Sequence, residues 1–173
     1  MVDEPVESPE ALIDATPAER ALSAIAATGI PFEVTRHGHV TSLEEAAAAR
    51  GLEPGRLVKS MVVRRADDDF LFVLVPGGRT ISWPKLRALL GVSRLSMPSA
   101  DVALAVTGYP RGTITPLGSV RPWPVIADAA MPSGPVSIGG GASGTAFTVD
   151  CAHLIRALDA QVADVTDPED PAA

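Results

Sequence analysis

The spacing of apolar and polar residues predicts an amphipathic helix as the first ordered element of the chain. The helix is expected to begin with a capping box, Thr16-Pro-Ala-Glu19, in which proline takes the first helical position. Leu22, Ile25 and Ala26 recur at helical spacing and form its expected apolar face. Gly29 is the expected stop.

The following stretches change between strand-like and helix-like patterns. Residues 32–36 alternate as a strand, and a second capping box at Ser42 opens an alanine-rich helix that ends at Gly51. Residues 57–65 and 70–75 are rich in β-branched and aromatic residues. The Asp-rich segment between them predicts a hairpin turn exposed to water.

The second half of the chain continues this alternation in shorter pieces. Ser82 is expected to cap a helix that ends at Gly91, and Pro98-Ser99 opens another through Ala105. Asp150 is expected to cap a last helix. The element order predicts one α+β domain, with a mixed curved sheet and helices packed against it. Further strands are expected at residues 125–127, 136–138 and 146–149.

Length and composition limit the chain to one folded unit. With 173 residues, 46% of them apolar, it can bury one core, and the domain is expected to span residues 16–166. Residues 1–15 and the tail 167–173 are acidic and without periodicity, so both ends are expected to be disordered. No apolar run approaches the ~18 residues needed to cross a bilayer. A cytoplasmic protein without a membrane partner is therefore expected.

Charge is distributed unevenly along the chain, whose net charge is −7. Residues 1–20 and 150–173 each carry six acidic residues and one basic residue, whereas residues 21–149 carry 12 basic against nine acidic. A mildly basic body suits one phosphodiester end of an RNA. The basic stripe expected of a protein that follows a long duplex is absent from the sequence, so no duplex DNA partner is expected.

Conventional catalytic groups are scarce in this sequence. The single cysteine, Cys151, excludes an internal disulfide and a cysteine zinc site, and its position at a helix start is interpreted as a packed residue. His37 and His39 flank a glycine but lack a third ligand, so we interpret them as loop histidines and expect no metal or cofactor. A catalyst built from these residues has to work mainly by positioning its substrate.

The segment from Gly108 to Gly118 contains three glycines and two prolines within eleven residues. Glycine lets the backbone approach a ligand closely, while proline restricts the loop before anything binds. Such a loop presents N–H groups that suit an anionic or carbonyl oxygen, although a plain connecting turn has the same composition. Gly139, Gly141 and Gly144 have G-x-G-x-x-G spacing but lead into a strand, so a dinucleotide site is not indicated.

Lys59 is one of only two lysines and lies inside the apolar run 57–63. A charge in such a run is costly unless it reaches solvent or an anion. Strand alternation allows a lysine on an open face of the sheet. The functional alternative is a cation that faces the glycine loop and is positioned for a phosphate or an ester.

Together these motifs resemble the YbaK/EbsC family, free-standing relatives of the editing domain inserted in bacterial prolyl-tRNA synthetases. The resemblance covers residues 18–165 in one consistent order. The segments that carry it are Val58-Lys-Ser-Met-Val62, Gly108-Tyr109, Gly112-x-x-x-Pro116, Gly118, Val125-x-x-Asp128 and the turn from Gly139 to Gly144.

The resemblance implies an editing-domain fold and hydrolysis of mischarged aminoacyl-tRNA in trans, of the Cys-tRNA(Pro) or Ala-tRNA(Pro) type. The expected partners are the tRNA acceptor end and, as a candidate, prolyl-tRNA synthetase. Lys59 is expected to hold the 3′ end, with amides near Gly112 and Gly140 polarising the ester carbonyl. The implied substrate-contacting residues are Ser60, Gly108, Tyr109, Arg111, Thr115, Pro116, Gly118, Asp128, Gly139, Gly141 and Ser143.

The sequence departs from the family pattern in two places. Family members commonly carry a basic residue in the glycine turn, where this chain has Ala142 and Ser143, and Arg111 or Arg121 could replace that contact. Ser60 stands where threonine is common and keeps the hydroxyl. These departures leave open a second function, a catalytically silent RNA- or nucleotide-binding module on the same fold.

Overall fold

The computed structural model describes residues 15–170, so the lead predicted for residues 1–15 lies outside it except for Ala15, as do residues 171–173. The helices are α2 (Pro17–Ala27), α3 (Leu43–Arg50), α4 (Trp83–Leu90), α5 (Ala100–Thr107) and α6 (Cys151–Ala157), with a 3-10 turn η1 (Pro54–Arg56). The strands are β1 (Phe32–Arg36), β2 (Leu57–Ala66), β3 (Asp69–Pro76), β4 (Arg79–Ile81), β5 (Val125–Asp128), β6 (Pro135–Gly139), β7 (Thr145–Asp150), β8 (Gln161–Ala163) and β9 (Thr166–Pro168).

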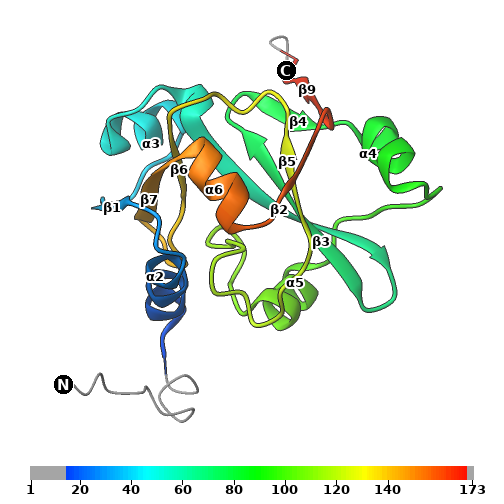
Figure 1. The fold of residues 1–173 in the computed structure, drawn as a ribbon, viewed down its shortest axis with the longest axis horizontal. Helices are drawn as coiled ribbons and strands as arrows, with labels where there is room; N and C mark the ends of the chain where they lie inside the picture. The colour runs from blue at the N-terminus through cyan, green and yellow to red at the C-terminus, as the bar shows by residue number, and fades with distance from the viewer. Residues whose placement is uncertain (1–14, 171–173) are drawn as a thin grey trace.

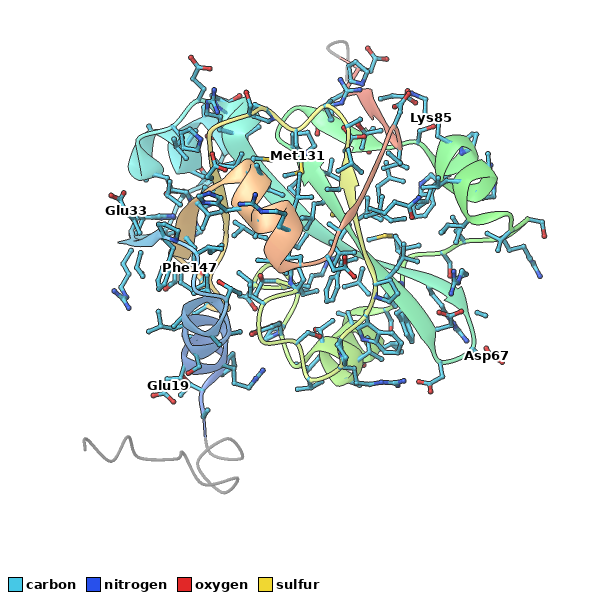
Figure 2. The ribbon with its side chains drawn as sticks, in the orientation of Figure 1. Glu19, Glu33, Asp67, Lys85, Met131 and Phe147 are labelled. Atoms are coloured by element: carbon cyan, nitrogen blue, oxygen red, sulfur yellow. The ribbon has the colours of Figure 1, made fainter. Side chains whose placement is uncertain are left out.

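A seven-stranded sheet in the order β1-β7-β6-β2-β3-β5-β8 forms the body of the protein, and β4 pairs with β9 separately. Figure 1 shows the predicted β2–β3 hairpin crossing the molecule between α3 and α4, and Asp67 lies at its tip (Figure 2). The pairs β2–β6, β3–β5 and β5–β8 are parallel, and the other pairs of this sheet are antiparallel. The α+β class with a mixed sheet is confirmed.

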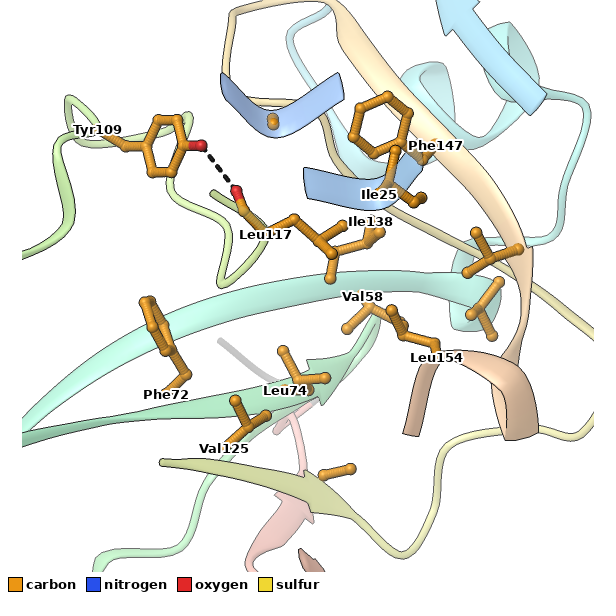
Figure 3. Packing of buried hydrophobic residues seen from close by; sticks show 14 of the residues in the cluster. Ile25, Val58, Phe72, Leu74, Tyr109, Leu117, Val125, Ile138, Phe147 and Leu154 are labelled. Carbon is orange, nitrogen blue, oxygen red and sulfur yellow. Dashed lines mark hydrogen bonds between the residues drawn. The ribbon is translucent and has the colours of Figure 1, made fainter. Parts of the chain in front are cut away.

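Alternate residues of β2 enter two separate cores, one on each face of the sheet. Val58 and Val62 pack in a cluster with α2, α6 and the loop that follows α5, and we call this side the loop face. Figure 3 shows Leu117 of that loop directed at Ile138. Val63 packs in the second cluster with residues of β4 and α4, and we call this side the α4 face.

Side-chain caps start the helices at the predicted positions. Thr16 and Glu19 form the complete capping box of α2. The side chains of Ser42, Ser82 and Asp150 each accept from the backbone N–H three residues further on. Each cap uses one N–H that the helix leaves unpaired, which is why these short helices begin sharply.

The apolar face predicted for α2 is wrong at two of its three positions. Ile25 is fully buried, but Leu22 is 37% exposed and Ala26 is exposed. Ala21 is buried instead, because that side of α2 packs tightly on the glycine turn at Gly141. The stop predicted at Gly29 is confirmed, since α2 ends at Ala27, Thr28 is its C-cap, and Gly29 follows with φ +74°.

Three short strands, β4, β8 and β9, were not predicted, since each has only three residues and no periodicity of its own. β9 exists through its pairing with β4, in which Pro168 lies opposite Arg79. Lys85, labelled in Figure 2, pairs with Asp167 at 3.0 Å and lowers the pKa of that carboxyl. Disorder predicted from Asp167 onward is therefore wrong for Asp167 and Pro168.

Candidate active site

The edge of β2 that faces β6 is paired at its two ends and open between them. β6 pairs with Leu57 and Val58, and Ser96 bridges Arg64 further along the same edge. Between these points no strand of the described residues 15–170 pairs with residues 59–63 on this side. We call this opening the β2 edge gap.

Within residues 15–170, main-chain polar groups of β2 at the β2 edge gap have no protein partner. The Arg64 N–H donates to the Ser96 carbonyl at 2.8 Å, and the Arg64 carbonyl accepts from the Ser96 N–H at 3.1 Å. Backbone polar groups point to the same edge of a strand at every second residue, so the N–H and C=O groups of Ser60 and Val62 face this edge as well. The Ser60 hydroxyl is buried, and within the described chain it has no hydrogen-bond partner. Buried polar groups are normally paired, so an unpaired set of this kind indicates a place for a ligand.

The loop between Gly108 and Gly118 borders the β2 edge gap on the loop face. The side chain of Ile114 packs against the loop-face core, and its carbonyl oxygen is 3.6 Å from where a Cβ on Gly139 would stand. Tyr109, which is fully buried, donates its hydroxyl hydrogen to the Leu117 carbonyl at 2.7 Å (Figure 3). The loop and the glycine turn are therefore brought together, as expected of two walls of one site.

An arginine of α2 holds the start of this loop, a contact that sequence reasoning missed because the two segments are 88 residues apart. Arg20 donates to the Gly108 carbonyl at 2.6 Å, and its guanidinium lies 5.1 Å from the centre of the Tyr109 ring. Burial raises the pKa of Tyr109, with Arg20 opposing that shift, so the phenol stays protonated as a donor. Tyr109 shapes the loop from inside and does not reach a ligand itself.

Two glycines of the loop have the same backbone conformation but different surroundings. Gly118 has φ +74°, and a Cβ there would lie 2.7 Å from both the Arg20 carbonyl oxygen and the Tyr109 hydroxyl. Gly112 has φ +89°, and a Cβ there would meet nothing within 4 Å. In the described part of the chain no group accepts from the Gly112 N–H, so Gly112 is the open end of the loop.

The glycine turn between Gly139 and Gly144 is more closed than expected. Gly140 is buried and its N–H donates to the Thr145 carbonyl at 2.8 Å. The expectation that the Gly140 amide polarises an ester carbonyl is therefore wrong for this conformation. Gly141 packs against α2 and has φ +84°. A Cβ added at Gly141 would lie 2.7 Å from the Pro17 carbonyl oxygen. Ser143 is exposed at the tip of the turn.

Lys59 lies on the α4 face, whereas the loop covers the opposite face. Its cross-strand neighbour, Val75, belongs to the α4-face core. The Lys59 ammonium donates to the Arg79 carbonyl at 2.8 Å and pairs with Glu169 at 3.4 Å, while the side chain stays 42% exposed. The expectation that Lys59 faces the glycine loop is wrong, because Lys59 and the loop lie on opposite faces of the sheet.

Asp128 supports the Lys59 region from inside the protein. It is 1% exposed, and its carboxylate accepts from the backbone N–H groups of Ala130 and Val165. It also lies 3.7 Å from Arg79 Nε, which donates to the Thr166 hydroxyl at 2.7 Å. Asp128 therefore holds Arg79 and β9 in place and is too deeply buried to contact a substrate.

The remaining predicted residues of the loop differ in access. Arg111 is exposed, Pro116 is half-buried, and Thr115 is fully buried with its hydroxyl accepting from the Leu117 N–H at 3.3 Å. Arg121 stacks at 4.0 Å on Trp123 and pairs with a hairpin aspartate. Arg111 is thus the loop cation that is open to a phosphate.

His37, in the connection between β1 and α3, contacts an arginine of α3. His37 accepts from Arg50 Nε at 3.3 Å, and Arg50 also donates to the Ser137 hydroxyl at 3.1 Å. Desolvation lowers the pKa of Arg50. Among residues 15–170, no three His, Cys, Asp or Glu side chains gather in a way that could hold a metal ion.

Cys151 is expected to be chemically inert in the folded protein. The residue is 4% exposed, and burial, together with the nearby Asp150, raises the pKa of its thiol. Because the thiolate is the reactive form, a thiol reagent should modify the folded protein at least about 10-fold more slowly than the urea-unfolded chain. Stopped-flow reaction with a disulfide reagent measures both rates. Equal rates would contradict the packed position of Cys151.

The fold places this protein among domains that edit charged tRNA. A crystal structure of a candidate trans-editing enzyme for prolyl tRNA synthetase superposes with a TM-score of 0.81 and 27% identity, covering 88% of this chain and 98% of that one. The family model of the aminoacyl-tRNA editing domain matches residues 37–157. The chain belongs to the aminoacyl-tRNA editing domain family.

Curated relatives include both synthetases and a free-standing protein. The proline–tRNA ligase of Thermosipho melanesiensis is 36% identical over 86 residues, which are 50% of this chain and 15% of that one. The chain therefore spans a small part of the synthetases that it matches. EbsC of Enterococcus faecalis, named as a candidate Cys-tRNA(Pro)/Cys-tRNA(Cys) deacylase, is 25% identical over 74% of this chain and 79% of its own length. None of the helices within residues 15–170 is long and apolar enough to cross a membrane.

Proposed function

We propose that this protein hydrolyses mischarged aminoacyl-tRNA in trans, of the Cys-tRNA(Pro) or Ala-tRNA(Pro) type. The observation that carries the proposal is the β2 edge gap, an opening lined by unpaired polar groups between the glycine loop and Gly139. Membership of the editing family supplies the class of substrate. The relatives support a tRNA acceptor end as ligand and prolyl-tRNA synthetase as the partner that releases it. We place this reaction in the cytoplasm.

The proposed mechanism needs no nucleophile from the protein, because an aminoacyl ester is already activated. Lys59 holds a phosphate of the RNA 3′ end, and N–H groups of Gly112 and Ser60 polarise the ester carbonyl. Water adds to the carbonyl carbon, the ester C–O bond breaks, and the ribose oxygen leaves with a proton. The products are a free amino acid and a tRNA with a free 3′ end. Positioning and carbonyl polarisation provide the rate enhancement.

A panel of mischarged tRNAs tests this function. The protein is incubated with tRNAs carrying labelled Cys, Ala, Ser or Thr, and the release of free amino acid is followed against spontaneous hydrolysis. We expect release well above the spontaneous rate for Cys or Ala on tRNA(Pro), with less release from Ser or Thr. Release at the spontaneous rate from every member of the panel would refute hydrolysis.

A catalytically silent RNA- or nucleotide-binding module is the second candidate. Two observations favour it: the Gly140 N–H is already bonded, and Ala142 and Ser143 leave the turn without a basic residue. It predicts binding of the same tRNAs without release of amino acid. Arg111, which is exposed on the loop, would then provide the phosphate contact.

Glu169 is expected to compete with RNA for Lys59. The ion pair between them is 3.4 Å long and half exposed, and the Glu169 N–H bonds the Gly78 carbonyl at 2.9 Å, which keeps the acid close. Glu169→Gln removes the negative charge and should tighten tRNA binding about two- to fivefold, since exposed pairs contribute up to ~1 kcal/mol. Filter binding measures the change. Unchanged or weaker binding would show that Glu169 does not compete.

A further inference from the structure

A cavity of about 540 Å³ opens where the parallel strands β3, β5 and β8 begin. Its volume lies within the ~300–1,000 Å³ typical of ligand sites. The walls are mostly apolar and include Leu71, Trp123 and Leu158, while the polar side chains of the lining come from Arg65, Asp159 and Gln161. None of the lining residues belongs to the β2 edge gap, so the cavity is a separate feature of the molecule.

Of the two charged groups in this lining, one is already paired. Arg65 donates to the Asp69 carboxylate at 2.9 and 3.3 Å. The Asp159 carboxylate makes no hydrogen bond or ion pair within residues 15–170. The free charge at the cavity is therefore negative.

Asp159 holds a backbone position that this chain otherwise gives to glycine. Its N–H donates to the Arg156 carbonyl at 3.1 Å, and the Ala160 N–H donates to the Ile155 carbonyl at 3.0 Å, which are the two bonds of a Schellman motif at the end of α6. The φ of Asp159 is +49°. The other described helices are each followed within two residues by a glycine of positive φ, namely Gly29, Gly51, Gly91 and Gly108.

An aspartate at this position is unfavourable for stability in two ways. A side chain raises the energy of the left-handed conformation relative to glycine. A negative charge at the carboxyl end of a helix also opposes the helix dipole. An unpaired acid that is kept at such a cost beside an apolar cavity indicates a ligand of opposite charge.

The open edge of β8 begins at the cavity. β8 is the last strand of the seven-stranded sheet, and its first residue, Gln161, is part of the lining. The Ala163 carbonyl accepts from the Ala129 N–H on the β5 side at 2.8 Å, so the N–H and C=O of Val162 point away from β5. The Val162 residue is 51% exposed. An extended segment can therefore pair with Val162 and place a side chain in the cavity.

We infer that this cavity binds an extended peptide segment of a partner protein, through a lysine or arginine side chain whose charge pairs with Asp159. The apolar stem of that side chain packs on the walls at Trp123 and Leu158. The inference does not depend on the proposed function. Arg65, the lining residue of β2, is six residues from Lys59, which is about 20 Å along an extended strand.

Trp123 fluorescence tests the inference without any RNA. The chain has two tryptophans, so Trp83→Phe leaves Trp123, in the cavity wall, as the only reporter. This variant is titrated with a capped tetrapeptide of valine, leucine, lysine and valine, with the same peptide carrying norleucine in place of lysine, and with butylamine. We expect saturable binding of the lysine peptide and about fivefold weaker binding of the norleucine peptide, as for one ion pair open to solvent. Butylamine, which lacks a backbone, should bind about tenfold more weakly or worse.

Matched variants separate Asp159 from the total charge of the protein. Asp159→Asn removes the charge and keeps a residue that is tolerated in the left-handed conformation, so the two peptides should then bind equally. Asp164 is an exposed acid on the other side of β8, pairs with Lys85 at 3.1 Å and lies outside the cavity. Asp164→Asn should leave the fivefold difference between the peptides unchanged.

Asp159→Gly tests whether the aspartate is kept for binding and not for stability. The midpoint of thermal unfolding, followed by circular dichroism, should stay equal or rise, because glycine is the usual residue at this position. A lower midpoint would show that Asp159 stabilises the fold, and the reason to assign it a ligand would be lost.

The peptide titrations give outcomes that the deacylation assay does not affect, since no probe contains RNA. Equal binding of the lysine and norleucine peptides, binding of butylamine as tight as that of the peptide, or an unchanged preference for lysine in Asp159→Asn would each overturn the inference. Absence of peptide binding, checked by isothermal titration calorimetry, would do so as well.

Discussion

Lys59→Ala is expected to lower kcat/KM for deacylation of the preferred mischarged tRNA about 10- to 10²-fold, since a hydrogen bond to a charged group contributes about 1.5–3 kcal/mol. Lys59 is the cation beside the β2 edge gap, with its ammonium held by the Arg79 carbonyl at 2.8 Å and the side chain 42% exposed. The loss should appear mainly as weaker binding, since Lys59 is proposed to contact a phosphate and not the ester. Single-turnover release of labelled amino acid at several enzyme concentrations separates binding from chemistry.

Lys85→Ala is the matched control for this prediction. Lys85 is the other lysine of the chain, its side chain is 39% exposed, and it pairs with C-terminal acids as Lys59 does. It lies outside the β2 edge gap, so its loss should change kcat/KM less than about threefold. Equal losses in the two variants would mean that total charge, not the position of Lys59, governs activity.

Gly118→Ala is expected to destabilise the protein by about 3 kcal/mol or more. A Cβ at this position meets the Arg20 carbonyl oxygen and the Tyr109 hydroxyl at 2.7 Å, and φ +74° is itself unfavourable for alanine. The hydrogen bond from Tyr109 to Leu117 would have to shift, which loosens the loop against the core. Urea unfolding followed by circular dichroism gives the change in the free energy of unfolding.

Gly112→Ala measures the cost in stability of a positive φ alone, without the steric crowding that is present at Gly118. Gly112 shares the positive φ but its Cβ would meet nothing within 4 Å, so the expected cost is only about 1 kcal/mol. If its N–H polarises the ester, activity should fall more than stability explains. A cost equal to that of Gly118→Ala would show that the loop is packed differently from the structure described.

The helix caps and the central hairpin could be predicted because each depends on residues close together in the chain. Thr16 bonds Glu19 three residues on, and the β2–β3 turn joins strands that pair across it. β9 could not be predicted, because Thr166–Pro168 becomes a strand only when β4 lies beside it. The buried face of α2 was partly mispredicted for the same reason, since its partner at Gly141 is distant in sequence.

Parts of the candidate site were also visible in the sequence, and the glycine loop and the glycine turn do meet in the structure. Their chemical roles were not visible, because the use of each N–H depends on local geometry. The Gly140 N–H donates to the Thr145 carbonyl, whereas the Gly112 N–H has no acceptor within the described residues. Asp128 belongs to a motif of the family resemblance, yet the structure buries it behind Arg79.

The sequence by itself determined the class of fold, the capped helices, the hairpin and the family, since these follow from periodicity and from motifs within short segments. Only the tertiary structure decided that Lys59 and the loop lie on opposite faces of β2, and that Glu169 reaches Lys59 from 110 residues away. It alone decided that the edge of β2 stays open. The physical reason is that backbone pairing and burial depend on which distant segments come together, and no local pattern records that.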